Sequence, residues 1–419
     1  MSGSAVAEGF LTQSVDGRFF LVAGYAASPG LAGPGATTSA TVNRVIGRID
    51  LTGAVDTTTA LTDAHNAGSI RGAVSVDGSS FWTTGSGNTT PGTNRGITHV
   101  SALGATTSTS ITTTITNARV ASIHDGQLYV STASTGFVGV NAIGTGLPTT
   151  SGQSAALLPG FSFVTGTGTI SQYDFWFADA QTCYVADDRS AANGGGIQKW
   201  VDVAGSWTFQ YTLSPGTGCR GLSGIRDQNG TQLFATTTTT FANALVTVMD
   251  TGPTAPFLTL ATAPPLTVFR GVRFVRTPSS TMLAGIGCPT TVGIPTIAPV
   301  GAPVSGNGAF ALAVGNAPAS TLWLTIVSIG LPLGSGLPLS LTIDTPACVT
   351  VYPQTFDIAL SGLTDTAGNG ILPLGLPVPD SSLWGLLLGS QHLVFDAAIS
   401  PSFTFPLGSS QGLQITIGN

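Results

Sequence analysis

The sequence predicts an all-β protein, and its composition and repeats point to this class. Glycine accounts for 56 of the 419 residues, and serine and threonine are abundant. These residues disfavour helices and suit short strands joined by tight turns. Charged residues make up 8 % of the chain, yet hydrophobic residues make up 42 %. This balance supplies a large core and excludes the highly charged, disordered class.

A hairpin recurs along the first two thirds of the chain. Its two strands alternate apolar and polar residues, as a half-buried sheet requires. Most of its turns end in glycine, which supplies the positive φ angle that a two-residue turn needs. The five turns are Asp16-Gly17, Asp77-Gly78, Asp125-Gly126, Ala180-Gln181 and Asn229-Gly230.

A second pair of strands follows each hairpin, which gives a four-stranded unit of roughly 50 residues. This is the pattern of a β-propeller blade. Residues 269–287 (FRGVRFVRTPSSTMLAGIG) supply the first half of a sixth unit, and the eight residues before Gly9 are too few to complete it. We therefore predict a β-propeller over residues 1–286 with about six blades, the last one incomplete.

Residues 287–419 show a different pattern. Short alternating runs are separated by Gly or Pro at roughly 8 to 12 residue intervals, which predicts a C-terminal β-sandwich. The uncharged run from Ser320 to Ile343 is interrupted by Pro332, Gly334, Gly336 and Pro338. It therefore predicts two strands and no membrane span.

The charges exclude nucleic acid as a partner. The net charge is −6, and no Lys or Arg follows Arg276. The final third of the chain therefore cannot neutralise phosphates, and the negative net charge disfavours nucleic-acid binding by the rest, so no nucleic-acid site is predicted. The start of the chain, MSGSAVAEGF, has neither the basic nor the apolar region of a secretory signal.

Several segments resemble a largely uncharacterised family of secreted bacterial propeller proteins rich in Thr and Gly. They are DGRFFLVAGY, TTSATVNRVIGRIDLTGAVDTTTALTDA, NARVASIHDGQLYVSTAS, GTGLPTTSGQ, YVADDRS and FRGVRF, which together span roughly residues 8 to 276. Members of the family carry a further upstream segment that closes the ring. The part from about Cys288 resembles a β-sandwich module at the end of exported bacterial proteins, through PACVTVYP, TDTAGNGILPLGLPVP and QGLQITIGN. Both resemblances imply export, with an extracellular or cell-surface location.

The four cysteines lack the spacing of a metal or redox site, so no zinc is predicted. An even number of cysteines in an exported protein favours disulfides. We predict the pairs Cys288–Cys348 and Cys183–Cys219, with buried free thiols as the alternative.

Four arginines form the candidate ligand site. Arg71, Arg119, Arg220 and Arg270 each stand at the start of the first strand of a blade. First strands converge on the propeller axis, so the arginines are expected to form a partial cationic ring. Such a ring binds an anion, for example a carboxylated sugar. The alternative is that each guanidinium bonds the backbone carbonyls of the next blade.

Other candidates are weaker. Asp187 and Asp188 form the acidic cluster best suited to bind calcium or a substrate. The alternative is that they form an ordinary Asp–Arg ion pair at the end of a strand. Asn88 and Asn229 match the N-glycosylation motif. No motif of a catalytic triad, zinc protease or phosphate-binding loop occurs, and Glu8 is expected in a frayed terminus. No cofactor is predicted.

The function predicted first is that of a non-catalytic, extracellular structural protein. An open sheet edge on one copy and a strand donor on another would assemble copies head to tail into a filament or surface layer. The alternatives are a glycan-binding or adhesive propeller and, ranked below it, a polysaccharide-active enzyme.

Overall fold

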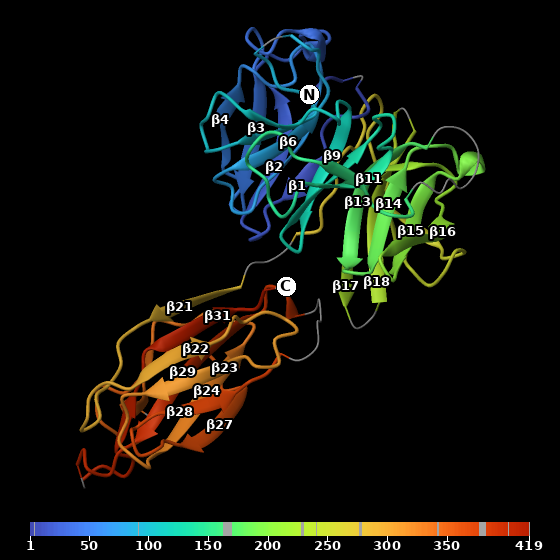
Figure 1. The fold of residues 1–419 in the computed structure, drawn as a ribbon. Coiled ribbons are helices and arrows are strands. Elements are labelled where there is room, and N and C mark those ends of the chain that lie inside the picture. The colour runs from blue at the N-terminus through green and yellow to red at the C-terminus, as the bar shows by residue number, and fades with distance from the viewer. Residues whose placement is uncertain are drawn as a thin grey trace. The chain divides into compact units, whose positions relative to one another are not determined.

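The computed structural model describes residues 1–3, 5–90, 92–161, 170–227, 230–239, 241–275, 279–341, 343–376, 383–400 and 402–418. The chain forms two compact units, Met1–Val275 and Arg276–Asn419. Both are all-β (Figure 1). The described ranges also hold three short 3-10 turns, Pro34–Ala36, Ala191–Asn193 and Leu339–Leu341. No helix within these ranges has the length and apolar character needed to cross a membrane.

The first unit is a β-propeller whose described residues form five complete four-stranded antiparallel blades. Neighbouring strands in each blade are neighbours in the chain. Blades 1 and 2 contain β1 (Leu11–Gln13), β2 (Phe19–Tyr25), β3 (Arg44–Asp50), β4 (Val55–Leu61), β5 (Ile70–Val74), β6 (Phe81–Gly85), β7 (Ile97–Val100) and β8 (Thr109–Thr112). Blade 3 contains β9 (Ala118–His124), β10 (Gln127–Thr132), β11 (Gly139–Ile143) and β12 (Ala155–Leu157). Blades 4 and 5 contain β13 (Gln172–Asp179), β14 (Thr182–Asp187), β15 (Gly196–Val203), β16 (Ser206–Leu213), β17 (Cys219–Asp227), β18 (Gly230–Thr237), β19 (Ala244–Met249) and β20 (Phe257–Thr262).

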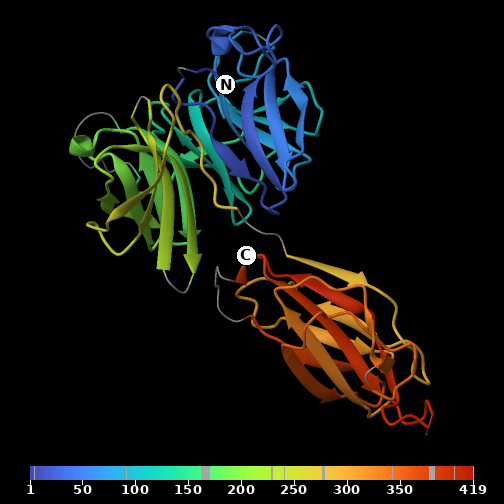
Figure 2. The ribbon, with the colours of Figure 1, turned by 180° about the vertical axis from the view of Figure 1, so that it is seen from behind.

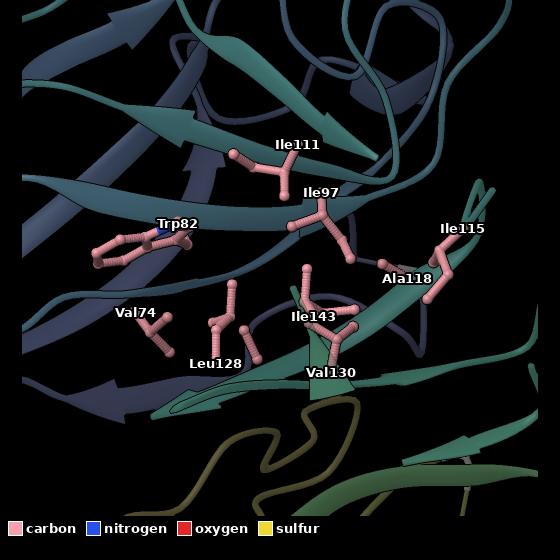
Figure 3. Close-up of a cluster of buried hydrophobic side chains, with 10 residues drawn as sticks. Val74, Trp82, Ile97, Ile111, Ile115, Ala118, Leu128, Val130 and Ile143 are labelled. Carbon is pink, nitrogen blue, oxygen red and sulfur yellow. The ribbon is translucent and has the colours of Figure 1, made fainter. Parts of the chain in front are cut away.

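Apolar layers between successive blades hold the propeller together. Figure 3 shows the layer between blades 2 and 3, where Val74, Trp82 and Ile97 face Leu128 and Val130. Similar clusters lie between blades 1 and 2, 3 and 4, and 4 and 5. Burying both faces of each inner sheet in this way is the main source of stability for a propeller.

The residues expected to begin a sixth blade close the ring without forming one. Residues 269–274 lie between the fifth and first blades (Figure 2). Gly271 N donates to Gly9 O at 3.0 Å, and Phe274 N donates to Ser223 Oγ at 2.8 Å. A Cβ at position 271 would collide with the backbone of Leu11, so this close approach requires glycine.

The rest of the predicted half-blade belongs to the second unit. Its second strand, β21 (Ser280–Ala284), pairs with β31 (Gly412–Thr416) at the edge of the larger sandwich sheet. All five residues of β21 pair with β31. This pairing stabilises β21 in the sandwich, although its alternating sequence also fits a propeller blade. The two units therefore divide between Val275 and Arg276, before this strand, and not at the predicted boundary between residues 286 and 287.

The second unit is a β-sandwich. Its larger sheet has the order β21-β31-β29-β24-β27, with β30 beside β29, and the smaller sheet has the order β22-β23-β28. The remaining bounds are β22 (Thr296–Val300), β23 (Ala311–Gly315), β24 (Leu322–Ile329), β25 (Leu337–Pro338), β26 (Thr350–Val351), β27 (Ile358–Leu363), β28 (Gly370–Pro373), β29 (Leu387–Phe395) and β30 (Leu407–Ser409). Phe310, Leu312, Trp323, Val394 and Ile415 pack between the two sheets as its core.

Candidate functional site

The four predicted arginines occupy comparable places in the propeller. Arg71, Arg119 and Arg220 are each the second residue of a first strand, and Arg270 lies in the closing segment 269–274. A threonine hydroxyl of the preceding blade marks the equivalence. Thr84 Oγ1 donates to Arg119 O and Thr236 Oγ1 donates to Arg270 O, both at 2.7 Å. Arg71, Arg119 and Arg220 therefore share a strand position, and Arg270 shares the threonine contact of Arg119.

Three of the arginines use N–H groups to hold the next element of the ring. Arg71 Nη1 donates to Ala118 O at 2.9 Å, and Arg119 Nη1 donates to Gln172 O at 2.6 Å. Arg270 donates to Ser2 O at 3.0 Å and to Glu8 O at 3.3 Å. These bonds match the alternative in which a guanidinium joins neighbouring blades.

Arg220 is different because its bond runs back to the preceding blade. Its Nε donates to Asp188 Oδ2 at 3.1 Å, and its side chain is 18 % exposed. Within the described part of the chain, its two terminal nitrogens have no hydrogen-bond partner. These donors remain available to a ligand.

A cavity of about 330 Å³ lies beside Arg220, between the N-terminal residues, blade 5 and the closing segment. Its wall is largely apolar with a few charged groups, as is common in small-molecule sites. The residues that give it this character are Phe10, Phe241, Phe269, Glu8, Arg220 and Arg270.

The axis next to this cavity is filled. Phe10, Val120 and Tyr173 form a buried cluster in which the rings of Phe10 and Tyr173 lie 5.8 Å apart. The guanidinium of Arg119 lies 3.9 Å from the Tyr173 ring centre, and that of Arg220 lies 5.9 Å from it. These cation–π contacts hold both arginines toward the axis.

Positive charges outnumber negative charges around the cavity and the four arginines. Four guanidinium groups lie among the carboxylates of Glu8 and Asp188. Burial lowers the pKa of Arg270, and nearby Arg220 lowers it further against the opposing effect of Glu8. Burial likewise lowers the pKa of Arg71, and Arg119 adds to this effect. A bound anion would relieve the repulsion between these like charges.

Glu8 is the functional candidate that sequence reasoning missed. We expected a frayed terminus, but Glu8 is 1 % exposed. Its carboxylate accepts hydrogen bonds from Ser2 N at 2.8 Å and from Tyr25 OH at 2.6 Å. Burial and this carboxylate raise the pKa of Tyr25. The signal present in the sequence is a lone glutamate three residues before the first strand, in a chain whose arginines need a counter-charge.

Asp187 and Asp188, the candidates for a calcium or substrate site, each form an ion pair with an arginine, which is the alternative that the sequence offered. Asp187 is bound by Arg189, with Nη2 to Oδ2 at 2.9 Å, and Asp188 is bound by Arg220. Across the described ranges, no three His, Cys, Asp or Glu side chains gather to hold a metal ion. Both carboxylates already have a cation as partner.

The cysteine predictions have different outcomes. Cys288 and Cys348 form a disulfide, as predicted, but Cys183 and Cys219 are buried free thiols. Cys183 packs in the layer between blades 3 and 4, and Cys219 packs in the layer between blades 4 and 5. The sheet of blade 4 separates the two sulfur atoms, which makes this second pairing wrong.

The two glycosylation candidates are placed differently. Asn88 is exposed, and its Oδ1 accepts a bond from Asn66 Nδ2 at 3.0 Å. Asn229 lies outside the described residues.

No protein-family model and no curated protein matches the chain. Among solved structures, it is similar to a candidate 6-phosphogluconolactonase from Bacteroides fragilis, at 11 % identity and a TM-score of 0.36, over 97 % of this chain and 99 % of that one. It is also similar to a fructofuranosidase from Schwanniomyces occidentalis, at 10 % identity and a TM-score of 0.34, over 98 % and 91 %. A third is an exo-β-1,3-galactanase from Phanerochaete chrysosporium, at 11 % identity and a TM-score of 0.29, over 88 % and 98 %.

The first functional prediction is corrected here. The prediction of a non-catalytic structural protein that assembles into filaments rests on an open sixth blade, and the described residues form no such blade. Residues 269–274 close the ring, and β21 is paired within the second unit.

Proposed function

We propose that the propeller binds an anionic carbohydrate, of the class of carboxylated sugars, in the cavity beside Arg220. The observation that carries this proposal is the position of Arg220. It lines the cavity, and its terminal nitrogens make no hydrogen bond to the described residues. A guanidinium held by Nε alone keeps a pair of donors in the geometry that fits a carboxylate.

The remaining wall suits a sugar ring. Phe241 and Phe269 offer apolar surface to the C–H face of a pyranose. Glu8 also lines the cavity, and beyond its bonds from Ser2 N and Tyr25 OH its carboxylate has lone pairs left for a hydroxyl group of the sugar. This combination of aromatic wall, acceptor and cation distinguishes an acidic sugar from an inorganic anion.

A calorimetric titration with a short oligogalacturonate, and with the neutral galactose oligomer of equal length, tests the proposal. We expect the acidic oligomer to bind and Arg220→Met to weaken it about 10- to 100-fold, the loss of a charge-assisted bond. Arg226→Met is the matched control, because Arg226 forms an exposed ion pair with Asp179. Lower thermal stability with unchanged affinity in Arg220→Met would show that Arg220 only joins blades.

A second candidate is cleavage of an acidic polysaccharide. The observation that favours it is the pair of carboxylates around Arg220. Glu8 lines the same cavity, and Asp188 bonds its Nε. Two carboxylates are the usual means of acid–base glycosidic cleavage. The titration mixtures, assayed for new reducing ends, separate binding from turnover.

We further propose an extracellular location. The Cys288–Cys348 disulfide supports it, because disulfides persist in oxidising compartments and are rare in reducing ones.

A further inference from the structure

The outermost strand of each blade is a sheet edge, and in blades 1 to 4 that edge is short or covered. In β4, Thr58 N donates to Asp56 Oδ1 at 2.9 Å, which occupies a backbone donor with a charged side chain. In β8, Ile111 O accepts from Gln153 N at 3.0 Å. In β16, Trp207 N donates to Pro159 O at 2.7 Å. The edge strand β12 has only three residues. Such cover and shortness prevent a sheet edge from pairing with another chain.

The edge of blade 5 lacks this protection. Strand β20 has the sequence FLTLAT, with no charge and no proline, and none of its six residues is buried. Within the described ranges, its backbone forms hydrogen bonds with β19 and with no other segment. A strand of this kind is a template for pairing with another strand.

One face of β20 is also apolar and open. Phe257 packs toward the layer between blades 4 and 5. Because side chains alternate along a strand, Leu258 points to the opposite face, where no sixth blade covers it. Leu260 lies in a β-bulge between Thr259 and Ala261. Leu258 and Leu260 are 62 % and 48 % exposed.

We propose that β20 pairs with β20 of a second copy of this chain, which gives a closed two-fold dimer. An antiparallel strand is its own partner across a two-fold axis, so the contact needs no separate donor segment. The strand carries no charge, so its two copies do not repel each other, although each chain carries a net charge of −6. Pairing joins two blades into one eight-stranded sheet and places the exposed leucines of both copies side by side.

Sedimentation equilibrium of the full chain over a concentration series tests this proposal. We expect a monomer–dimer equilibrium, and Leu258→Lys should raise the dimer dissociation constant by about tenfold or more. Val55→Lys is the matched control, because Val55 is 63 % exposed on the protected edge strand β4. It should leave the equilibrium unchanged.

A cysteine near the centre of the strand supplies a second readout that does not depend on affinity. Thr259→Cys should form a disulfide between copies on mild oxidation, and Val55→Cys should not. A wild-type chain that stays monomeric, an open-ended polymer, or a dimer that Leu258→Lys does not weaken would overturn the proposal.

Discussion

At the scale of single residues, His392 shows how burial creates pH dependence. Its Nδ1 lies 2.8 Å from Thr325 Oγ1, and its Nε2 lies 3.3 Å from Ala313 O in the opposite sheet. Burial lowers the pKa of His392 to about 4. As the pH falls from about 6.5 to about 4, the unfolded chain takes up a proton that the folded sandwich excludes, so stability is present above this window and is lost within it.

We therefore expect the second unit to lose up to about 1.4 kcal/mol of unfolding free energy per pH unit within this window. Urea unfolding of the full chain at several pH values measures the slope. His392→Gln should flatten it, because glutamine keeps hydrogen-bonding capacity without titrating. His124→Gln, on the propeller, should leave it unchanged. Equal slopes in wild type and His392→Gln would assign the pH dependence to other groups.

The candidate site shows which part of a residue's role is readable from sequence. The repeat predicted that Arg71, Arg119, Arg220 and Arg270 hold equivalent positions. It did not predict that Arg220 would turn back to Asp188, because a guanidinium follows whatever acceptors its neighbours present. Glu8 was missed for the same reason. Its burial depends on Ser2, Tyr25 and the loop packed around them, which lie outside any local pattern.

At the scale of elements, one ion pair anchors the closing segment to blade 4. Arg273 donates from Nη1 to Asp174 Oδ2 at 2.8 Å and from Nη2 to Asp174 Oδ1 at 3.0 Å. The same carboxylate accepts from Leu222 N at 3.0 Å. The Asp174 side chain is fully buried, so residues 269–274 are tied to β13 and β17 at one point.

Removing this charge should be costly. Asp174→Asn leaves the Arg273 guanidinium without its counter-ion, and we expect a loss of about 3–5 kcal/mol in the unfolding free energy of the propeller. Asp179→Asn is the control, because the Asp179–Arg226 pair is about half exposed and should cost less than about 1 kcal/mol. Equal effects of the two variants in urea unfolding would show that the closing segment does not depend on the buried pair.

Strand β21 marks the limit of prediction for elements. The run STMLA was correctly expected to be a strand, because residue type and alternation are local. Its partner was not predictable in this way. An edge strand pairs with whichever free edge folding brings near it, and here that edge is β31.

At the scale of the whole molecule, hairpin spacing and a change in composition were sufficient to predict a propeller followed by a sandwich. The spacing and the composition did not predict the contacts that close the propeller and cross-link the sandwich. The propeller is closed by a single segment across the ring, and the sandwich is closed by a covalent bond. Both the closing segment and the disulfide connect residues that are far apart in the chain. Of the two, only the disulfide was predictable, because cysteines can be recognised in the sequence.

We expect the disulfide to stabilise the second unit and to leave the stability of the propeller unchanged. Cys288 and Cys348 are separated by 60 residues, and Cys288 packs with Ile326, Val349, Val351 and Leu393 in a small core. Opening this loop frees the unfolded chain, so Cys288→Ala with Cys348→Ala should lower the unfolding free energy of the sandwich by about 2–4 kcal/mol. Calorimetry of the full chain, with and without reductant, should show a shift in the sandwich transition and none in that of the propeller.

Thiol titration in denaturant should count two reactive groups before reduction and four after it, because Cys183 and Cys219 are free. Four groups before reduction, or a propeller transition that moves with the sandwich, would contradict this assignment.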